Sequence, residues 1–106
     1  MLQRDNNTKG VSMKAVIAKL NVAEGKEAEF EKAMLDLVAQ VNEKEEGCDL
    51  YTLCKDADGN YFMMELYKDQ AALDAHGKTE HFRASGASFA GVMAGAPEIT
   101  RLDVIG

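Results

Sequence analysis

The chain has 106 residues, 46% hydrophobic and 28% charged, a balance typical of one globular domain rather than a disordered or fibrous protein. Its formal net charge of −6 argues against a nucleic acid or an anionic membrane as partner, because phosphate binding requires clustered lysines and arginines. No run approaches the ~20 apolar residues of a membrane span, and the polar start lacks the apolar core of a signal peptide. We therefore expect a cytoplasmic protein that binds small molecules or another protein.

The first predicted element is a strand that follows a polar extension. Residues 1–12 are polar and show no periodicity, which predicts a disordered extension before a single folded domain over residues 13–106. Residues 13–22 are β-compatible and apolar on both parities for most of their length. This pattern predicts a strand that is covered on both faces.

An amphipathic helix is predicted next. Apolar residues from Phe30 to Val41 recur at steps of three and four, with Glu and Lys between them. Asn21 and Glu24 form a candidate capping box at its start, and Gly47 is a candidate C′ residue at its end. The last turn, residues 43–46, is acidic although the helix dipole favours cations there, and the sequence offers no reason for this.

Two further strands are predicted as an antiparallel hairpin. Residues 48–55 and 60–68 are rich in Tyr, Phe, Leu and Thr, and the Asp-Gly pair within residues 56–59 favours a tight turn. Cys48 and Cys54 would lie ~20 Å apart in one strand, beyond the ~7 Å limit for a disulfide. An internal disulfide between them is therefore excluded if both cysteines lie in this strand.

The remaining segments predict a broken second helix and a final strand. Asp69 can cap a short helix that runs to about His76, and Thr79 can cap a second helical segment. Gly77 is the predicted position of a bend between them. Residues 97–105 are β-compatible and end the chain.

The element order β-α-β-β-α-β predicts an α+β fold of the ferredoxin-like, split βαβ type, with a four-stranded antiparallel sheet and two helices on one face. The third strand alternates two sets of side chains, and neither set is adapted to solvent. One set comprises Phe62, Met64 and Leu66, and the other Tyr61, Met63, Glu65 and Tyr67. Because an uncovered apolar face is unfavourable, we expect two sheets to pack together in a homodimer.

The chain resembles the antibiotic biosynthesis monooxygenase family, which includes cofactor-independent quinol and polyketide monooxygenases and small isomerases of signalling metabolites. The resemblance covers about residues 13–106 and rests on four segments: residues 22–30, 46–51, 65–76 and 79–82. It implies a dimeric α+β barrel with a substrate pocket between sheet and helices in each subunit. Studied monooxygenases of the family carry a tryptophan in that pocket, as do heme-degrading relatives, whereas this chain has none.

Three titratable residues are the candidate catalytic groups. Glu65 lies in an otherwise apolar strand, where it could act as a general base, fix the tautomer of a histidine, or support the fold. His76 and His81 are the only histidines, and each could accept a proton or simply cap or pack a helix. In an unbroken helix they would point about 140° apart, so they share a pocket only if the chain bends between them.

The candidate substrate-binding residues are aromatic, apolar or cationic. Tyrosines could line an aromatic pocket or merely pack, the apolar residues could form its wall or the core, and arginine could pair with an anionic substrate. The candidates are Tyr51, Tyr61, Tyr67, Met64, Phe82, Arg83 and Phe89. No metal site and no bound cofactor are expected.

We expect a cofactor-independent monooxygenase that oxidises a small quinol or phenol-like aromatic compound with molecular oxygen. A histidine that takes a proton from such a compound leaves an electron-rich anion, which can reduce oxygen without metal or flavin. One alternative is an isomerase of a small carbonyl signalling metabolite. Another is a non-catalytic dimer that binds a ligand or serves a stress response.

Overall fold

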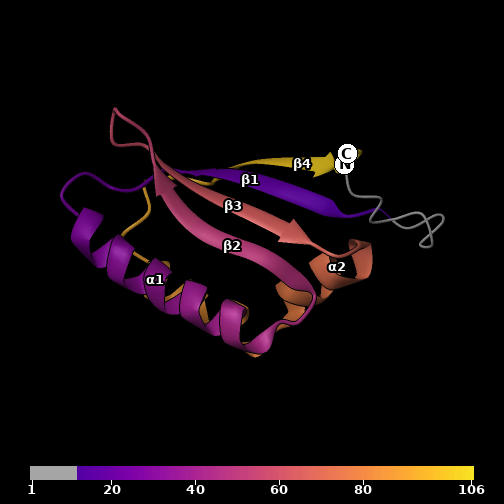
Figure 1. The fold of residues 1–106 in the computed structure, drawn as a ribbon. Coiled ribbons are helices and arrows are strands. Elements are labelled where there is room, and N and C mark those ends of the chain that lie inside the picture. The colour runs from indigo at the N-terminus through magenta and orange to yellow at the C-terminus, as the bar shows by residue number, and fades with distance from the viewer. Residues whose placement is uncertain (1–11) are drawn as a thin grey trace.

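The computed structural model describes residues 12–106, and this part of the chain contains four strands and three helices (Figure 1). The predicted extension lies almost entirely outside the described residues. In chain order the elements are β1 (Lys14–Leu20), α1 (Glu27–Lys44), β2 (Cys48–Lys55), β3 (Tyr61–Tyr67), α2 (Gln70–Lys78), α3 (Glu80–Phe89) and β4 (Glu98–Asp103). None of the described helices is long and apolar enough to cross a membrane.

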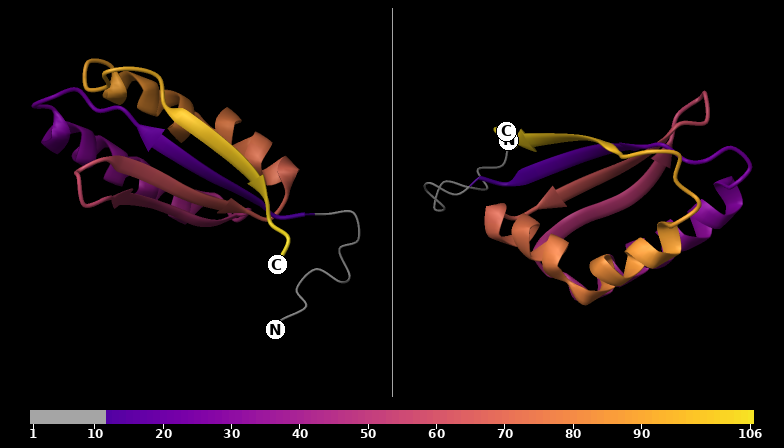
Figure 2. Two further views of the ribbon diagram at one scale, coloured as in Figure 1. Left: turned by 90° about the horizontal axis from the view of Figure 1, so that it is seen from above. Right: turned by 180° about the vertical axis from the view of Figure 1, so that it is seen from behind.

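The strands form one sheet in the order β2-β3-β1-β4, and every neighbouring pair is antiparallel. All three helices lie on the same face of this sheet, as the views from the front, from above and from behind show (Figures 1 and 2). The α+β ferredoxin-like fold predicted from the element order is confirmed, with the second helix divided into α2 and α3.

Helix α1 contributes four buried side chains to the core beneath the sheet. Its side chains Phe30, Met34, Leu37 and Val41 recur at helical spacing and are all buried, as the periodicity predicted. The predicted capping box at its start is wrong. The helix begins at Glu27 without a side-chain cap, and the Asn21 side chain instead donates a hydrogen bond to the Ala96 carbonyl.

Gly47 does not end α1, which stops at Lys44. Its role is close packing between the start of β2 and helix α2. A Cβ atom at Gly47 would lie 2.6 Å from the Cβ of Ala72, closer than two methyl groups can approach. This contact brings α2 against the C-terminal end of α1.

Thr79 divides the second helical segment. Asp69 caps α2 by accepting a hydrogen bond from the Ala72 N–H, and Thr79 caps α3 by accepting one from the Phe82 N–H, as predicted. The Thr79 hydroxyl also donates to the His76 carbonyl at 2.8 Å, and its extended backbone ends α2. The predicted bend at Gly77 is wrong, because Gly77 lies inside α2.

The sheet has one face that no described helix covers. Paired residues of neighbouring strands point to the same side, so the register places Ile17, Met64 and Thr100 in one row and Leu66 and Leu102 in the next. Ile17, Met64 and Leu102 are 37%, 41% and 44% exposed. We call this surface the open face and define it by Ile17, Phe62, Met64, Leu66 and Leu102.

The hairpin between β2 and β3 turns at Gly59, whose positive φ of 88° suits glycine. The Asp56 side chain accepts hydrogen bonds from the Asp58 and Asn60 N–H groups and stabilises the turn. Because β2 and β3 pair in antiparallel orientation, the predicted hairpin is confirmed. Both cysteines are free thiols.

Candidate functional site

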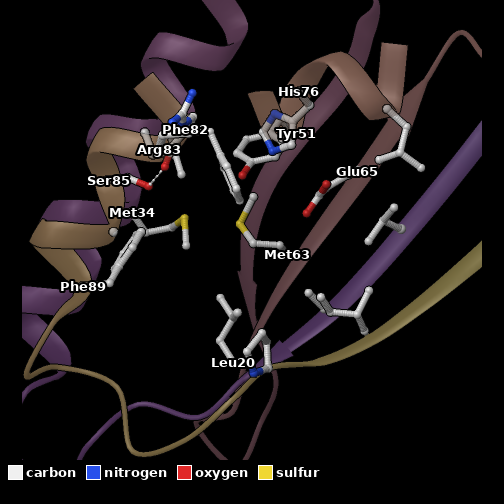
Figure 3. Close-up of a pocket in the computed structure, with 18 of the residues that line it drawn as sticks. Leu20, Met34, Tyr51, Met63, Glu65, His76, Phe82, Arg83, Ser85 and Phe89 are labelled. Atoms are coloured by element: carbon white, nitrogen blue, oxygen red, sulfur yellow. Dashed lines mark hydrogen bonds between the residues drawn. The ribbon is translucent and has the colours of Figure 1, made fainter. Parts of the chain in front are cut away.

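A cavity of about 720 Å³ lies between the sheet and the helices, which is the size of a small-molecule site. Its sheet wall includes Val16, Met63, Glu65 and Tyr51, while α1, α2 and α3 supply the opposite wall (Figure 3). The apolar lining residues include Met34, Leu37, Phe82, Phe89 and Met93. A few polar side chains, from Tyr51, Glu65, His76, Arg83 and Arg101 among others, interrupt this apolar lining.

One row of side chains crosses all four strands of the sheet wall. Glu65 on β3 pairs with Tyr51 on β2 and with Val16 on β1, and Val16 in turn pairs with Arg101 on β4. Because paired residues point to the same face, Tyr51, Glu65 and Arg101 all project toward the helices and the cavity. The strand register therefore brings an acid, a phenol and a guanidinium to one surface.

Glu65 is a half-buried carboxylate that accepts a hydrogen bond from the Tyr67 hydroxyl at 2.6 Å. Burial raises its pKa above the ordinary value of 4.5, and this effect exceeds the opposing effects of the Tyr67 hydrogen bond, His76 and Arg101. Burial also raises the pKa of Tyr67, and the Glu65 charge raises it further. Tyr67 is therefore a neutral phenol that donates a hydrogen bond to the Glu65 side chain.

The two histidines converge on a carboxylate that closes the end of α1. His76 Nδ1 lies 3.0 Å from both side-chain oxygens of Glu45, and His81 Nε2 lies 2.5 Å from Glu45 Oε2. All three side chains are nearly buried, with 7%, 8% and 9% exposure for His76, His81 and Glu45. The break at Thr79 makes this possible, because it directs both histidines to one point.

This contact determines the tautomer of His76. A carboxylate only accepts hydrogen bonds, so His76 must donate through Nδ1–H, and Nε2 of the neutral ring keeps a lone pair. Nε2 has no hydrogen-bond partner among residues 12–106. Every fully buried side-chain nitrogen or oxygen of these residues does have a partner, so Nε2 is not fully buried. His76 Nε2 is therefore accessible from the cavity that His76 lines.

Aromatic rings fix the orientation of the His76 ring. The ring centroids of Phe82, Tyr51 and Tyr67 lie 4.6, 5.1 and 5.6 Å from that of His76. Figure 3 shows His76 beside Tyr51, with Phe82 approaching from the helix wall. Glu45 and these three rings therefore hold the His76 ring in one orientation, as a proton acceptor in a cavity requires.

The Tyr51 hydroxyl is the second polar atom that is open to the cavity. It has no hydrogen bond within the described residues, and the same argument as for His76 makes its oxygen accessible from the cavity. Burial raises the pKa of Tyr51, and the charges of Glu65 and Glu45 raise it further. Tyr51 therefore offers a neutral hydroxyl that can donate to a ligand.

Most of the residues predicted to form the site lie on the cavity, and four do not. Glu65, His76, Tyr51, Phe82, Arg83 and Phe89 line it. His81 supports Glu45 from behind, and Tyr67 lies behind Glu65. The Tyr61 hydroxyl donates to Glu31 of α1, and Met64 lies on the open face because alternate residues of a strand point to opposite sides.

Glu45 and Arg101 are among the residues of the site that were not predicted from the sequence. The acidic last turn of α1 was a signal for Glu45, because a carboxylate at a helix C-terminus opposes the dipole and requires another reason. No sequence pattern around Arg101 indicated a place in the site, since only the β1–β4 register brings it to the row that contains Glu65.

Comparisons with known proteins agree with this architecture. The family model described as antibiotic biosynthesis monooxygenase matches residues 13–87. A solved structure of a putative antibiotic biosynthesis monooxygenase from Caulobacter crescentus CB15 is 44% identical, with a TM-score of 0.86 over 91% of this chain and 92% of that one. PA3566 from Pseudomonas aeruginosa is 28% identical, with a TM-score of 0.79 over 90% of this chain and 96% of that one.

A conserved protein from Methanosarcina mazei Go1 is also similar, with 26% identity and a TM-score of 0.79 over 87% of this chain and 92% of that one. A search of curated proteins found no match. These three solved structures match 87% to 91% of this chain.

Proposed function

Because this chain belongs to the antibiotic biosynthesis monooxygenase family, we propose that it oxidises a small quinol or phenol-like aromatic compound with molecular oxygen, without metal or flavin. The observation that carries the proposal is the state of His76, which Glu45 holds through Nδ1 and whose Nε2 faces the cavity. A neutral imidazole in this position is suited to accept a proton from a phenolic hydroxyl.

The reaction begins with that proton transfer. His76 Nε2 takes the hydroxyl proton, and the resulting electron-rich anion passes one electron to oxygen. The two radicals combine at a ring carbon to form a hydroperoxide. Loss of the ring proton and cleavage of the O–O bond leave one oxygen on the ring, and the other leaves as water. For a hydroquinone, the substrate and one O₂ give a hydroxyquinone and one water, so atoms and electrons balance.

The sheet wall supports the charge changes of this sequence. The Tyr51 hydroxyl can donate a hydrogen bond to the substrate anion or to the peroxide oxygen, because its raised pKa keeps it protonated. The raised pKa of Glu65 favours a carboxyl group that returns a proton to the departing oxygen. The apolar walls exclude water and hold the aromatic ring.

Oxygen consumption with a panel of hydroquinones tests this function. We expect enzyme-dependent uptake that His76→Ala abolishes. His81→Ala should reduce it less, because His81 contacts Glu45 without lining the cavity. Uptake by the His76→Ala variant at the wild-type rate would contradict the proposal, as would no uptake with any hydroquinone.

A second candidate function is isomerisation of a small carbonyl metabolite. It is supported by the placement of two proton-transfer groups, His76 and Glu65, on one cavity. His76 would remove a proton beside the carbonyl, and Glu65 would return one elsewhere. Deuterium incorporation from heavy water without oxygen uptake would favour this function. A ligand recovered without chemical change or deuterium would instead favour a non-catalytic binding protein.

We also propose that the functional form is a homodimer in which a second copy covers the open face. This face presents two rows of apolar side chains that no described helix covers, and such an exposed apolar surface is unfavourable for a monomer. A two-fold axis would pack the open face of one copy against the open face of the other. The cavity lies on the other side of the sheet and would stay open to substrate.

A further inference from the structure

The two arginines of the described chain both line the cavity, one on each wall. Neither makes an ion pair with another residue of 12–106, although Asp and Glu outnumber Lys and Arg by 18 to 12 in the sequence. Four lysines do pair with carboxylates: Lys14, Lys26, Lys55 and Lys68. Two guanidinium groups therefore remain free to bind a ligand in the cavity.

Of the two arginines, Arg101 is the one that shares the sheet wall with Glu65, a candidate proton-transfer group. It lies on β4 in the same row as Glu65, two strand positions away, which corresponds to ~10 Å between Cα atoms. Its charge reaches Glu65 without an ion pair between them, and burial outweighs its effect because the pKa of Glu65 is still raised. Because the two side chains form no ion pair, the Arg101 guanidinium is available to a ligand in the cavity.

Arg83 has a different position. It comes from α3, and its guanidinium lies on the helix wall, apart from Glu65 (Figure 3). The two arginines thus differ in geometry although they line the same cavity. This difference provides a matched comparison, because loss of either one removes the same charge.

We propose that the substrate is an aromatic acid, with its reactive hydroxyl at His76 and Glu65 and a carboxylate bound by Arg101 at the far end of the ring system. Arginine suits this role because its planar donors match the two oxygens of a carboxylate. The spacing of ~10 Å between the Cα atoms of Glu65 and Arg101 favours a carboxylate that is remote from the reactive hydroxyl. This inference rests on the proposed function for the identity of the reacting hydroxyl.

Anaerobic binding of matched ligands tests the inference without turnover. The probes are 5,8-dihydroxy-2-naphthoate, its methyl ester, and 1,4-dihydroxy-2-naphthoate, whose carboxylate is adjacent to a hydroxyl. We expect the wild type to bind the first probe about 10- to 100-fold more tightly than the ester, the range of a charge-assisted hydrogen bond. The 1,4 isomer should lack most of this advantage.

Arg101→Gln should remove the preference for acid over ester and leave ester affinity within about twofold. Arg83→Gln should retain it, and so should Lys78→Gln, which removes a charge from an exposed site on α2. Equal binding of acid and ester by the wild type would overturn the inference. It would also be overturned if Arg101→Gln kept the preference, or if either control lost it.

The same probes separate this inference from the proposed function. If the acid is preferred through Arg101 but neither ligand is oxidised in air, the aromatic-acid site stands and the monooxygenase proposal fails. If both are oxidised without any preference for the acid, the monooxygenase proposal stands and the inference fails.

Discussion

The carboxylate of Glu45 holds His76 from the far end of α1, with both of its oxygens 3.0 Å from His76 Nδ1. The two residues are 31 positions apart in the sequence. The contact fixes the proton on Nδ1 and leaves Nε2 for the cavity. We therefore expect Glu45 to be a positioning residue that acts through His76, because it contacts His76 without lining the cavity itself.

We expect Glu45→Gln to lower kcat about 100-fold, the scale of general base catalysis, with a smaller effect on KM. An amide is uncharged and offers one acceptor oxygen where the carboxylate offers two, so both histidines lose a charged partner and His76 loses one of its two acceptor oxygens. Nitrogen-15 NMR of the imidazole rings should show a changed tautomer balance for His76. The matched control is Glu43→Gln, an exposed glutamate two residues earlier in α1, and an unchanged His76 spectrum in Glu45→Gln would contradict this role.

Glu65→Gln should change how stability depends on pH. The folded pKa of Glu65 is raised above its ordinary value of 4.5, so the folded protein binds this proton more tightly than the unfolded chain. The stabilisation that this proton provides is present below pH 4.5 and is lost as pH rises through the folded pKa. The glutamine variant should therefore gain stability relative to wild type across this window, as measured by urea unfolding.

Glu31→Gln provides the control of opposite sign for that experiment. The hydrogen bond from Tyr61 lowers the pKa of Glu31, so its contribution is present above pH 4.5 and is lost as pH falls through the folded pKa. Relative to wild type, this variant should lose stability as pH rises. If the stability of both variants relative to wild type changed in the same direction with pH, burial of Glu65 would not be the cause of the pH dependence.

Tyr51→Phe and Tyr61→Phe should separate ligand binding from stability. Both tyrosines are 4% exposed, but the Tyr51 hydroxyl faces the cavity whereas the Tyr61 hydroxyl bonds to Glu31. Tyr51→Phe should weaken binding of a dihydroxynaphthoate several-fold with little loss of stability. Tyr61→Phe should cost about 0.5–1.5 kcal/mol in unfolding free energy and leave binding intact. Similar effects of both variants on binding would contradict the assignment.

Gly47→Ala should destabilise the protein by about 1–3 kcal/mol, because the new methyl group would collide with Ala72. The double variant Gly47→Ala/Ala72→Gly should regain most of that loss in thermal or urea unfolding. Gly77→Ala is the control, since it lies inside α2 with open space around it, and it should stabilise by up to about 1 kcal/mol. Destabilisation by Gly77→Ala would support the bend that the sequence predicted at Gly77.

Ile17→Glu should dissociate the proposed dimer. Ile17 lies at the centre of the open face, where a second copy would bury the new charge without a partner. Sedimentation at micromolar concentration should show a dimer for wild type and a monomer for this variant. Leu35→Glu places the same charge on an equally apolar, 54% exposed position of α1 and should remain dimeric. A monomeric wild type would refute the dimer.

The sequence by itself determined the elements and the side-chain parity of the strands. The helical spacing from Phe30 to Val41 and the alternation along β3 are local patterns, since each depends on residues a few positions apart. The caps at Asp69 and Thr79 are equally local, and both were predicted. The role of Gly47 was not, because its packing against Ala72 involves a helix that lies further along the chain.

The tertiary structure alone decided how the site is assembled. Glu45 meets His76 and His81 across 31 and 36 positions, and Arg101 joins the row of Glu65 through a strand at the other end of the chain. No periodicity encodes such pairings, because they depend on strand register and on how α1 packs against α2 and α3. The acidic turn at the end of α1 opposed the helix dipole locally, and its reason lies in the two histidines that fold against it.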